Sequence, residues 1–321
     1  MNGRREGGGR DWSATAWLTA WRIVRRLPEP GVRSLGTIFG LLYWGLDRRR
    51  RGVLRANLRP VLGPSATAVE VERVVRRGFV SYGHYWGEAF QLERLSQAQI
   101  LRRTTVEGRE HIDQALAGGR GAIFATPHVG NWDAGAAWLV ASGYKLTTIV
   151  ERLEPAELFE RFLDYRRALG MEILPLDNGS ESMRGLLRAL RAGRLVALVC
   201  DRDLTGHGLP VRLFGRTAIM PGGPASLALK TGAPLLPCSV YHDRRQGHWV
   251  AVVRPPIRPE PSGDQRADAL ALTQLLAAEF EQLISHAPEQ WHVLSRFWRG
   301  VPLGRGPADA QPSAATGGSG S

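Results

Sequence analysis

The first third of the chain carries apolar residues at helical spacing. They recur with the period of an α-helix over residues 12–27, 55–63 and 69–92. A continuous apolar run over 35–46 (LGTIFGLLYWGL) lies between the first two of these segments. That run covers about half of the roughly 20 residues that a membrane-spanning helix needs, so we predict no membrane crossing. We expect residues 11–103 to form a helical, membrane-associating part of the molecule.

Short apolar runs alternate with helical segments from residue 104 onward. The predicted strands are residues 122–125, 145–150, 172–175, 195–199, 235–240 and 249–253. The predicted helices are residues 111–117, 133–142, 156–169, 181–192, 224–231 and 267–285. This alternation is typical of an α/β protein with a mostly parallel, helix-covered sheet, which binds ligands at the carboxyl ends of its strands. We predict such a core over 104–304, in one domain with the helical N-terminal part.

The two ends of the chain contain few residues that could be buried. Residues 1–10 (MNGRREGGGR) and 305–321 (RGPADAQPSAATGGSGS) are rich in glycine and polar residues. We expect both to be disordered. The start of the chain also lacks an apolar run followed by a small-residue cleavage site, so we expect no signal peptide.

The composition fits a globular protein with an anionic partner. Hydrophobic residues make up 43% of the 321 residues, which is enough for a full core. Cys200 and Cys238 are too few for a disulfide framework or a zinc knuckle, and they fit a reducing compartment. The net charge is +12, carried almost entirely by arginine. Such an excess favours nucleic acid, an acidic membrane surface or a phosphorylated substrate as the partner.

Nucleic-acid binding is the weaker of these alternatives. The arginines are neither interleaved with aromatic residues on strands nor grouped on a recognition helix. We therefore expect no nucleic-acid partner, and keep a basic nucleic-acid-binding protein as an alternative from a different functional class. We also expect a monomer.

Two N-terminal segments favour an anionic membrane surface instead. In the segment 12–27, tryptophans lie on the apolar arc and arginines on the opposite arc, as in a helix that lies in a membrane interface. The run 35–46 is followed by four consecutive arginines, Arg48 to Arg51, a combination that recurs beside anionic headgroups. The alternatives are a surface helix packed on its own domain and a solvated charged face. The two segments together favour peripheral membrane association.

The stretch 122–137 (AIFATPHVGNWDAGAA) joins a buried strand to a histidine and the start of a helix. Pro127 ends the strand, His128 follows it, and Asp133 lies where the helix begins. A neutral imidazole can remove a proton from a hydroxyl at neutral pH, and a carboxylate bonded to its other nitrogen fixes the tautomer. We predict that His128 is a general base that Asp133 orients.

The remaining motifs limit what this base can act on. The chain has no G-x-S-x-G elbow and no cysteine near His128 in sequence, so the base is expected to act directly on a bound substrate hydroxyl. It has neither a Walker motif nor a dinucleotide fingerprint, and we expect no cofactor. A metal-dependent hydrolase with His128 and Asp133 as ligands stays an alternative, although no further ligands cluster with them. His84 and Glu88, one helical turn apart, likewise lack a third ligand.

Charged residues at two further strand ends are candidate substrate contacts. Glu151 and Arg152 follow the predicted strand 145–150, and Arg166 lies on the next predicted helix. Their arginines could hold a phosphate. The run Asp201, Arg202, Asp203 follows the predicted strand 195–199, where packing explains three charged residues poorly. We therefore expect substrate binding at both places.

Six short motifs, in their order along the chain, resemble those of a known family. They are HVGNWD, VERL, the D-R-D run, FGR, PGGPASLA and PEQWH. The chain is identified as similar to bacterial lysophospholipid-type acyltransferases related to the lipid A lauroyl and myristoyl acyltransferases. Within that family it looks most like the branch that acylates phosphatidylinositol mannosides. The pieces AWRIVRRLPE, RANLRPVLG and SYGHYWGEAFQL are similar too, so the likeness covers roughly residues 16–300.

The resemblance implies transfer of a long, palmitoyl-like acyl group from acyl-CoA to a mannose hydroxyl of a phosphatidylinositol mannoside. It implies a peripheral enzyme at the cytoplasmic face of the cell membrane, with acyl-CoA as co-substrate, a glycolipid acceptor and no covalent acyl-enzyme. His128 is expected as the base and Asp133 as its partner. The family places a further acidic residue near the histidine, for which Asp201, Asp203 and Glu151 are the candidates. An acceptor of the lipid A or lysophospholipid type stays open.

Overall fold

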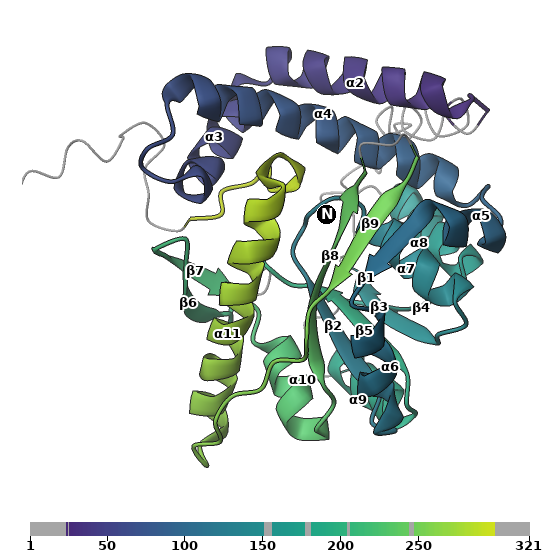
Figure 1. Cartoon of the computed structure of the whole chain (residues 1–321), viewed down its shortest axis with the longest axis vertical. Helices are drawn as coiled ribbons and strands as arrows, with labels where there is room; N and C mark the ends of the chain where they lie inside the picture. Colours follow the sequence, from purple (N-terminus) through teal and green to yellow (C-terminus); the bar gives the residue numbers. More distant parts are fainter. Residues whose placement is uncertain are drawn as a thin grey trace, which may run out of the picture.

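The N-terminal part of the protein is helical, as the apolar period predicts. A computed structural model describes residues 24, 26–150, 156–176, 181–203, 206–243 and 247–298 (Figure 1). The N-terminal helices are α2 (Glu29–Leu46), α3 (Arg48–Leu62), α4 (Ala68–Leu92) and α5 (Gln97–Arg103). The predicted tails and nearly all of the predicted helix 12–27 lie outside the described residues. No helix in the described part of the chain is both long and apolar enough to span a bilayer.

Helix α5 is absent from the sequence prediction because its apolar signal is weak. Only Ile100 of its seven residues is buried. What starts the helix is a capping box, in which the Ser96 side chain accepts a hydrogen bond from the Gln99 N–H and the Gln99 side chain accepts one from the Ser96 N–H. Local hydrogen bonding, rather than burial, therefore decides this element.

Helices α2 and α4 approach each other through glycines. A Cβ at Gly83 would lie 2.1 Å from the carbonyl oxygen of Gly36, and one at Gly40 would lie 2.5 Å from that of Phe79. The backbones meet so closely that any side chain at these positions would force them apart. The face of α2 toward α4 therefore holds small residues where the backbones meet, whereas Tyr43 and Trp44 contact α4 near the end of α2.

A central seven-stranded sheet carries the rest of the chain. Its order is β1-β9-β8-β2-β5-β3-β4. The pairs from β8 to β4 are parallel, and β8 and β9 are antiparallel. The strands are β1 (Thr104–Glu107), β2 (Ala122–Thr126), β3 (Leu146–Val150), β4 (Glu172–Pro175), β5 (Leu195–Val199), β8 (Leu235–His242) and β9 (Trp249–Val253). The predicted mostly parallel α/β fold is confirmed.

Three strands differ from the sequence prediction. Strand β1 has four residues of which one is buried, so it lacks the apolar run that marks the other strands. Strands β6 (Leu209–Leu213) and β7 (Arg216–Met220) form a separate antiparallel hairpin. No strand was expected there, because Arg212 interrupts the apolar residues of β6 and the polar residues Arg216 and Thr217 begin β7.

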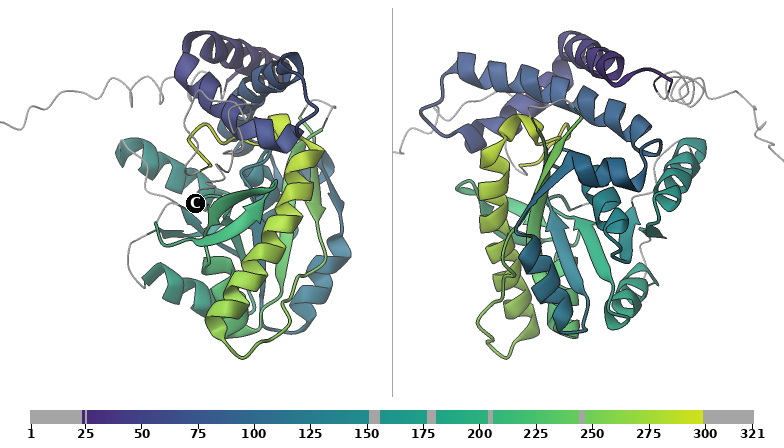
Figure 2. Two further views of the ribbon diagram at one scale, coloured as in Figure 1. Left: turned by 90° about the vertical axis from the view of Figure 1, so that its left-hand side faces the viewer. Right: turned by 45° about the vertical axis from the view of Figure 1, so that its right-hand side comes forward.

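Helices cover both faces of the sheet, because side chains alternate along each strand. On β2, Ile123 and Ala125 join a core with α9 (Glu181–Arg191), α10 (Gly223–Thr231) and α11 (Gln265–His286). Ala122 and Phe124 join the opposite core. That core includes α6 (Arg109–Ala117), α7 (Trp132–Ala141) and α8 (Ala156–Ala168). Figures 1 and 2 show α2 and α4 lying across one end of this layered structure.

Candidate active site

His128 lies in a tightly held loop between β2 and α7. Gly130 has a φ of 61°, and a Cβ there would lie 1.9 Å from the carbonyl oxygen of Val240, so glycine is required. The Gly130 N–H donates to the carbonyl of Gln290 at 2.9 Å, and the Asn131 N–H donates to that of Val240 at 2.8 Å. The Asn131 side chain then caps α7 by accepting from the Ala134 N–H at 3.0 Å. The loop between histidine and helix is thus anchored to two distant segments.

The residue that orients His128 is Asp201, at the carboxyl end of β5. Asp201 Oδ1 accepts a hydrogen bond from Nδ1 of His128, and Oδ2 accepts one from the His128 backbone N–H at 3.1 Å. Trp291 Nε1 donates a third, at 2.8 Å. Because a carboxylate can only accept, the ring proton lies on Nδ1 and Nε2 keeps its lone pair. The His128 side chain is 20% exposed, whereas that of Asp201 is fully buried.

Burial by itself would raise the pKa of Asp201. The neighbouring His128 and the hydrogen bonds from His128 and Trp291 outweigh this, and the pKa of the carboxyl is lowered. Asp201 therefore stays ionised and can stabilise a positive charge on the His128 ring.

The prediction that Asp133 orients His128 is wrong. Asp133 Oδ1 accepts from Nε of Arg166 at 2.8 Å, and Oδ2 accepts from the second guanidinium nitrogen at 3.2 Å and from the Tyr85 hydroxyl at 3.0 Å. Asp133 is the second residue of α7, and this position turns its carboxylate toward α4 and α8 rather than back to the loop. Both oxygens are engaged, so the alternative of a metal held by His128 and Asp133 finds no support either.

Arg166 forms a buried ion pair with Asp133. Its side chain is 16% exposed and that of Asp133 is 3% exposed. Burial would lower the pKa of Arg166, but the attraction of Asp133 and their hydrogen bonds raise it. The pair ties α8 to the first turn of α7, next to the histidine loop.

The other predicted contacts divide between described and undescribed residues. Arg202 donates to Ser295 Oγ at 3.0 Å, and Asp203 Oδ2 accepts from the Gly208 N–H at 3.1 Å. Both line the same cavity as His128 and Arg166. Their role in substrate binding stays a prediction. Glu151 and Arg152 lie outside the described residues.

His128 opens into a cavity of about 1390 Å³. This exceeds the roughly 300–1,000 Å³ of pockets for drug-sized molecules, so the cavity has room for a long ligand or for parts of two. Near α2 and α4 its wall is aromatic and includes Tyr43, Tyr82, Tyr85, Trp86, Trp132, Phe162 and His292. At the other end it reaches Lys230 and Arg266.

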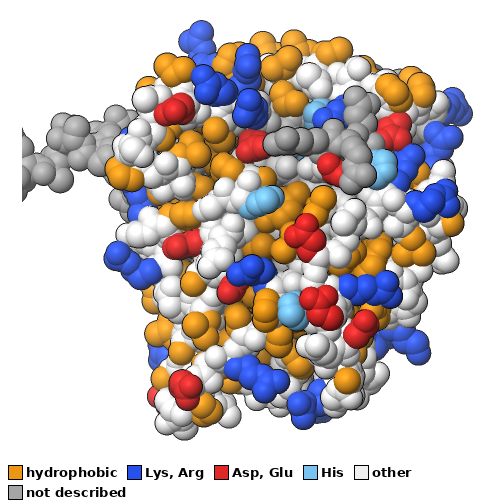
Figure 3. Space-filling model, in the orientation of Figure 1, with side chains coloured by type: hydrophobic (Ala, Val, Ile, Leu, Met, Phe, Trp, Pro, Cys, Tyr) orange, Lys and Arg blue, Asp and Glu red, His pale blue; other side chains and the backbone are white. Residues whose placement is uncertain are grey.

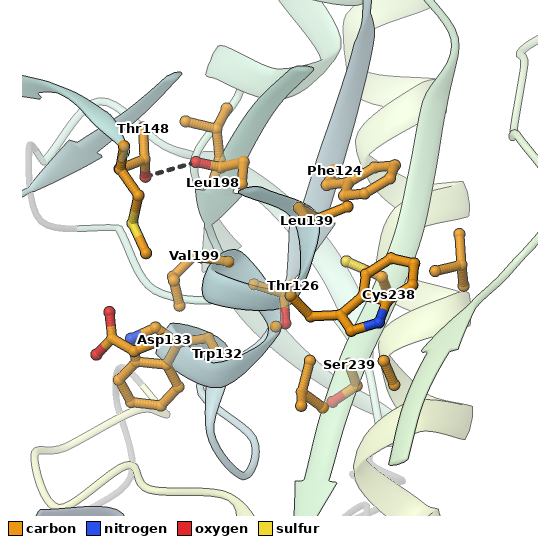
Figure 4. A pocket seen from close by; sticks show the side chains of 18 of the residues that line it. Phe124, Thr126, Trp132, Asp133, Leu139, Thr148, Leu198, Val199, Cys238 and Ser239 are labelled. Carbon is orange, nitrogen blue, oxygen red and sulfur yellow. Dashed lines mark hydrogen bonds between the residues drawn. The ribbon is translucent and has the colours of Figure 1, made fainter. Parts of the chain in front are cut away.

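A smaller apolar cavity of about 90 Å³ lies between α7 and the sheet (Figure 4). Phe124, Leu139, Val199 and Cys238 are among its lining residues. It shares wall residues with the large cavity, namely Trp132, Ile149, Val150, Arg166, Leu198 and Val199. A hydrocarbon group that enters from the large cavity would meet an apolar surface here.

Glu88 is a supporting residue whose role the sequence does not reveal. Its Oε2 accepts from Asn131 Nδ2 at 2.8 Å and from Trp249 Nε1 at 2.7 Å, and it pairs with Nδ1 of His242 at 3.1 Å. Burial would raise the pKa of Glu88, but His242 and these hydrogen bonds lower it to about 2. The carboxylate therefore fixes Asn131, and with it the loop between His128 and Asp133. The sequence signal was the spacing of His84 and Glu88, a pair that could ligate a metal but lacks a third ligand nearby in sequence.

His84 serves a separate contact, a 2.9 Å hydrogen bond between its Nε2 and Thr37 Oγ1 on α2. Among the described residues, no group of three His, Cys, Asp or Glu side chains is arranged to hold a metal ion.

The C-terminal segment 288–292 (PEQWH) closes the site. Trp291 bonds to Asp201, and the His292 N–H donates to the His128 carbonyl at 2.7 Å. The sequence marks this segment through the family resemblance alone, because its partners lie about 90 and 160 residues earlier in the chain.

Comparison with known proteins finds similar sequences that cover most of the chain. The family model of bacterial lipid A biosynthesis acyltransferases matches residues 9–300. A phosphatidylinositol mannoside acyltransferase of Mycobacterium tuberculosis is 39% identical over 294 residues, covering 90% of this chain and 88% of the relative. One from Mycolicibacterium smegmatis is 36% identical over 286 residues, covering 88% and 90%.

A lipid A biosynthesis lauroyltransferase of Escherichia coli is more distant. It is 26% identical over 297 residues, which cover 90% of this chain and 93% of the relative. The match to the family model and to these relatives extends through both the helical N-terminal part and the α/β core. The chain therefore belongs to the bacterial lipid A biosynthesis acyltransferase family, and it is an acyltransferase.

Proposed function

We propose that this acyltransferase moves a long-chain acyl group from acyl-CoA to a mannose hydroxyl of a phosphatidylinositol mannoside. The observation that carries the proposal is the pair of His128 and Asp201. Nε2 of His128 has no protein partner in the described structure, and His128 lines the large cavity. The names of the relatives that are 36–39% identical over about 90% of the chain support this acceptor.

In the proposed reaction, Nε2 of His128 takes the proton of the acceptor hydroxyl as its oxygen attacks the thioester carbonyl carbon. A new C–O bond forms, and the tetrahedral intermediate collapses with cleavage of the C–S bond. The imidazolium then returns the proton to the leaving thiolate, which yields the ester and free CoA. Asp201 stabilises the imidazolium between the two steps, and general-base catalysis of this kind contributes about 10²- to 10⁴-fold.

The apolar cavity beside α7 supports a donor that carries a hydrocarbon chain. Trp132 lines both cavities, and the centroid of its ring lies 5.4 Å from that of the His128 ring. If the thioester carbonyl lies beside His128, the hydrocarbon chain of the donor begins close to these apolar walls. Burying that chain is favourable by about 0.8 kcal/mol per CH₂ group.

The outward face of α2 supports an anionic membrane surface as the partner. Its exposed apolar side chains are Leu35, Ile38, Phe39, Leu41, Leu42 and Leu46, with Leu46 82% exposed. Helices packed through glycines, with large apolar residues outward, are typical of a lipid environment. Figure 3 shows hydrophobic side chains along the upper edge of the molecule, where α2 lies, with basic side chains beside them.

The basic residues next to α2 complete this surface. Arg48, Arg49 and Arg50 are exposed, and the guanidinium groups of Arg50 and Arg51 lie over the rings of Tyr43 and Trp44. As part of the proposal, the enzyme lies peripherally at the cytoplasmic face of the membrane and the glycolipid acceptor enters below α2. The exposed apolar and basic side chains support an anionic membrane surface as its partner.

The proposal is tested by incubating the purified full chain with palmitoyl-CoA and a panel of lipid acceptors, followed by mass spectrometry of the products. We expect acylated phosphatidylinositol mannoside, and none with His128→Ala, whose fold should be intact because the side chain is partly exposed. Acylation of only a lipid A-type or lysophospholipid acceptor would redirect the assignment. Wild-type turnover by His128→Ala would overturn the mechanism.

A further inference from the structure

The large cavity extends well beyond the residues of the proposed reaction. His128 lies at the carboxyl ends of the strands, next to the segment 288–292 that follows α11. Lys230, in the last turn of α10, and Arg266, in the first turn of α11, line the same cavity at its other end. Helix α11 has 22 residues and is therefore about 33 Å long. The two ends of the cavity are therefore far apart. Figure 1 shows α10 ending and α11 beginning toward the same lower side, away from α2.

The described lining of this cavity carries more basic than acidic side chains. Its basic residues are Arg50, Arg166, Arg202, Lys230 and Arg266, of which Arg50 pairs with Asp47 and Arg166 with Asp133, whereas Asp203 is the single carboxylate among the described lining residues. That carboxylate already accepts a hydrogen bond from the Gly208 N–H. A ligand of this cavity is therefore favoured if it carries negative charge.

Lys230 and Arg266 are exposed, and they differ from the basic residues that neutralise a carboxylate. Arg55, Arg103, Arg161, Arg194 and Arg254 all form ion pairs with glutamates. In the described structure neither Lys230 nor Arg266 has a carboxylate partner. The nearest acidic neighbours of Arg266 in sequence serve other groups: Asp264 accepts from N–H groups of α11, and Asp268 accepts from Ser262.

The two ends of the cavity suit the two substrates of the proposed function differently. One end of the cavity is lined by Tyr43 and Arg50 and lies next to α2 and α4. A lipid acceptor would enter this end from the membrane. The end at Lys230 and Arg266 lies away from that surface. A donor that places its thioester at His128 must extend its remaining length into the rest of the cavity, and coenzyme A carries its phosphates at the end remote from the thioester.

We propose that Lys230 and Arg266 form an anion-binding site for the nucleotide phosphates of the acyl-CoA donor. This inference rests on the proposed function for the identity of the donor. A phosphodiester of the acceptor headgroup has the same chemistry, but its membrane-side entry places it at the opposite end of the cavity. Cations that bind phosphate through charge-assisted hydrogen bonds then fix the donor in one direction along the cavity.

The test measures binding of free CoA to the full-length protein by titration calorimetry, without lipid. We expect Lys230→Ala and Arg266→Ala each to weaken CoA binding about tenfold, with a larger effect at low salt. Lys230→Arg and Arg266→Lys should restore most of the affinity. The matched control is the double variant Lys145→Ala/Arg191→Ala, which removes an exposed lysine and an exposed arginine that do not line this cavity. It should bind CoA as the wild type does.

Two further arms separate the sources of phosphate and the two proposals. Glycerophosphoinositol represents the acceptor headgroup, and its binding should be unchanged in Lys230→Ala/Arg266→Ala. The same variant should raise the KM for palmitoyl-CoA but leave transfer from palmitoyl-pantetheine, which lacks the nucleotide, unchanged. The proposed anion-binding site is wrong if Lys230→Ala/Arg266→Ala binds CoA within twofold of the control. It is also wrong if this variant loses only glycerophosphoinositol binding. If the wild type binds CoA and the substitutions weaken this binding, but the wild type transfers no acyl group, the anion-binding site stands and the proposed function is wrong.

Discussion

Asp201 holds His128 at two points, the Nδ1 of its ring and its backbone N–H. The two residues follow neighbouring parallel strands, β5 and β2, whose carboxyl ends lie side by side. This double contact fixes both the position of the loop and the orientation of the ring. Nε2 is thereby directed to the cavity in a tautomer that can accept a proton.

Asp201→Asn should therefore act on the chemical step. The amide keeps the shape of the side chain but lacks the charge that stabilises the imidazolium, and it can favour the wrong tautomer. We expect kcat to fall by about 10²- to 10⁴-fold with little change in the KM for the donor. Steady-state kinetics on a variant with an unchanged circular dichroism spectrum checks this. A kcat within threefold of the wild type would show that Asp201 does not orient the base.

Asp133→Asn should act mainly on stability, because it leaves Arg166 buried without a counter-charge. Removing one partner of a buried ion pair costs about 3–5 kcal/mol, measured as the free energy of unfolding in urea. A suitable control is Asp164→Asn, which removes the partner of Arg167 in a pair whose side chains are 55% and 63% exposed. That change should cost less than about 1 kcal/mol. Equal effects of the two substitutions would contradict the structural role of the buried pair.

His84 should make the protein less stable as the pH falls from about 6.5 to 4. Burial, followed by the nearby positive charge of Arg33, lowers its pKa to about 4. Between these values the unfolded chain binds a proton that the folded protein does not, so the free energy of unfolding rises with pH. The shift corresponds to roughly 3 kcal/mol.

His84→Gln removes this titration while keeping a side chain that can bond to Thr37. Urea unfolding at a series of pH values should show a flatter profile between pH 4 and 6.5 than in the wild type. An unchanged slope over that range would mean that other groups cause the acid sensitivity.

Ile38→Asp and Leu42→Asp should weaken binding to anionic vesicles without unfolding the protein. Both side chains are more than half exposed on α2, at 53% and 57%. An acidic residue there loses apolar burial in the lipid and repels the headgroups, so we expect a loss of about tenfold each in a sedimentation assay. Leu275→Asp, at an exposed apolar position on α11, should have no effect.

Loss of Arg48 and Arg49 should weaken the same binding more at low salt than at high salt, because salt screens exposed charges. Vesicle binding that is insensitive to both sets of substitutions would remove α2 and its arginines from the membrane surface.

The sequence by itself determined the class of fold and the chemical centre of the site. Helical and strand periods are local properties of the chain, so the strands 172–175, 195–199 and 249–253 agree with β4, β5 and β9. The placement of His128 after a buried strand is local in the same sense. The elements that sequence missed, α5, β1 and the β6–β7 hairpin, have weak or interrupted apolar patterns.

Only the tertiary structure decided which side chains meet at that centre. Asp133 is five residues from His128, yet the turn into α7 directs its carboxylate to Arg166. Asp201 is 73 residues away, and parallel pairing of β2 with β5 brings it to the ring. Glu88 reaches the same loop from α4. Side-chain direction depends on how elements pack against one another, and spacing along a chain carries no information about that packing.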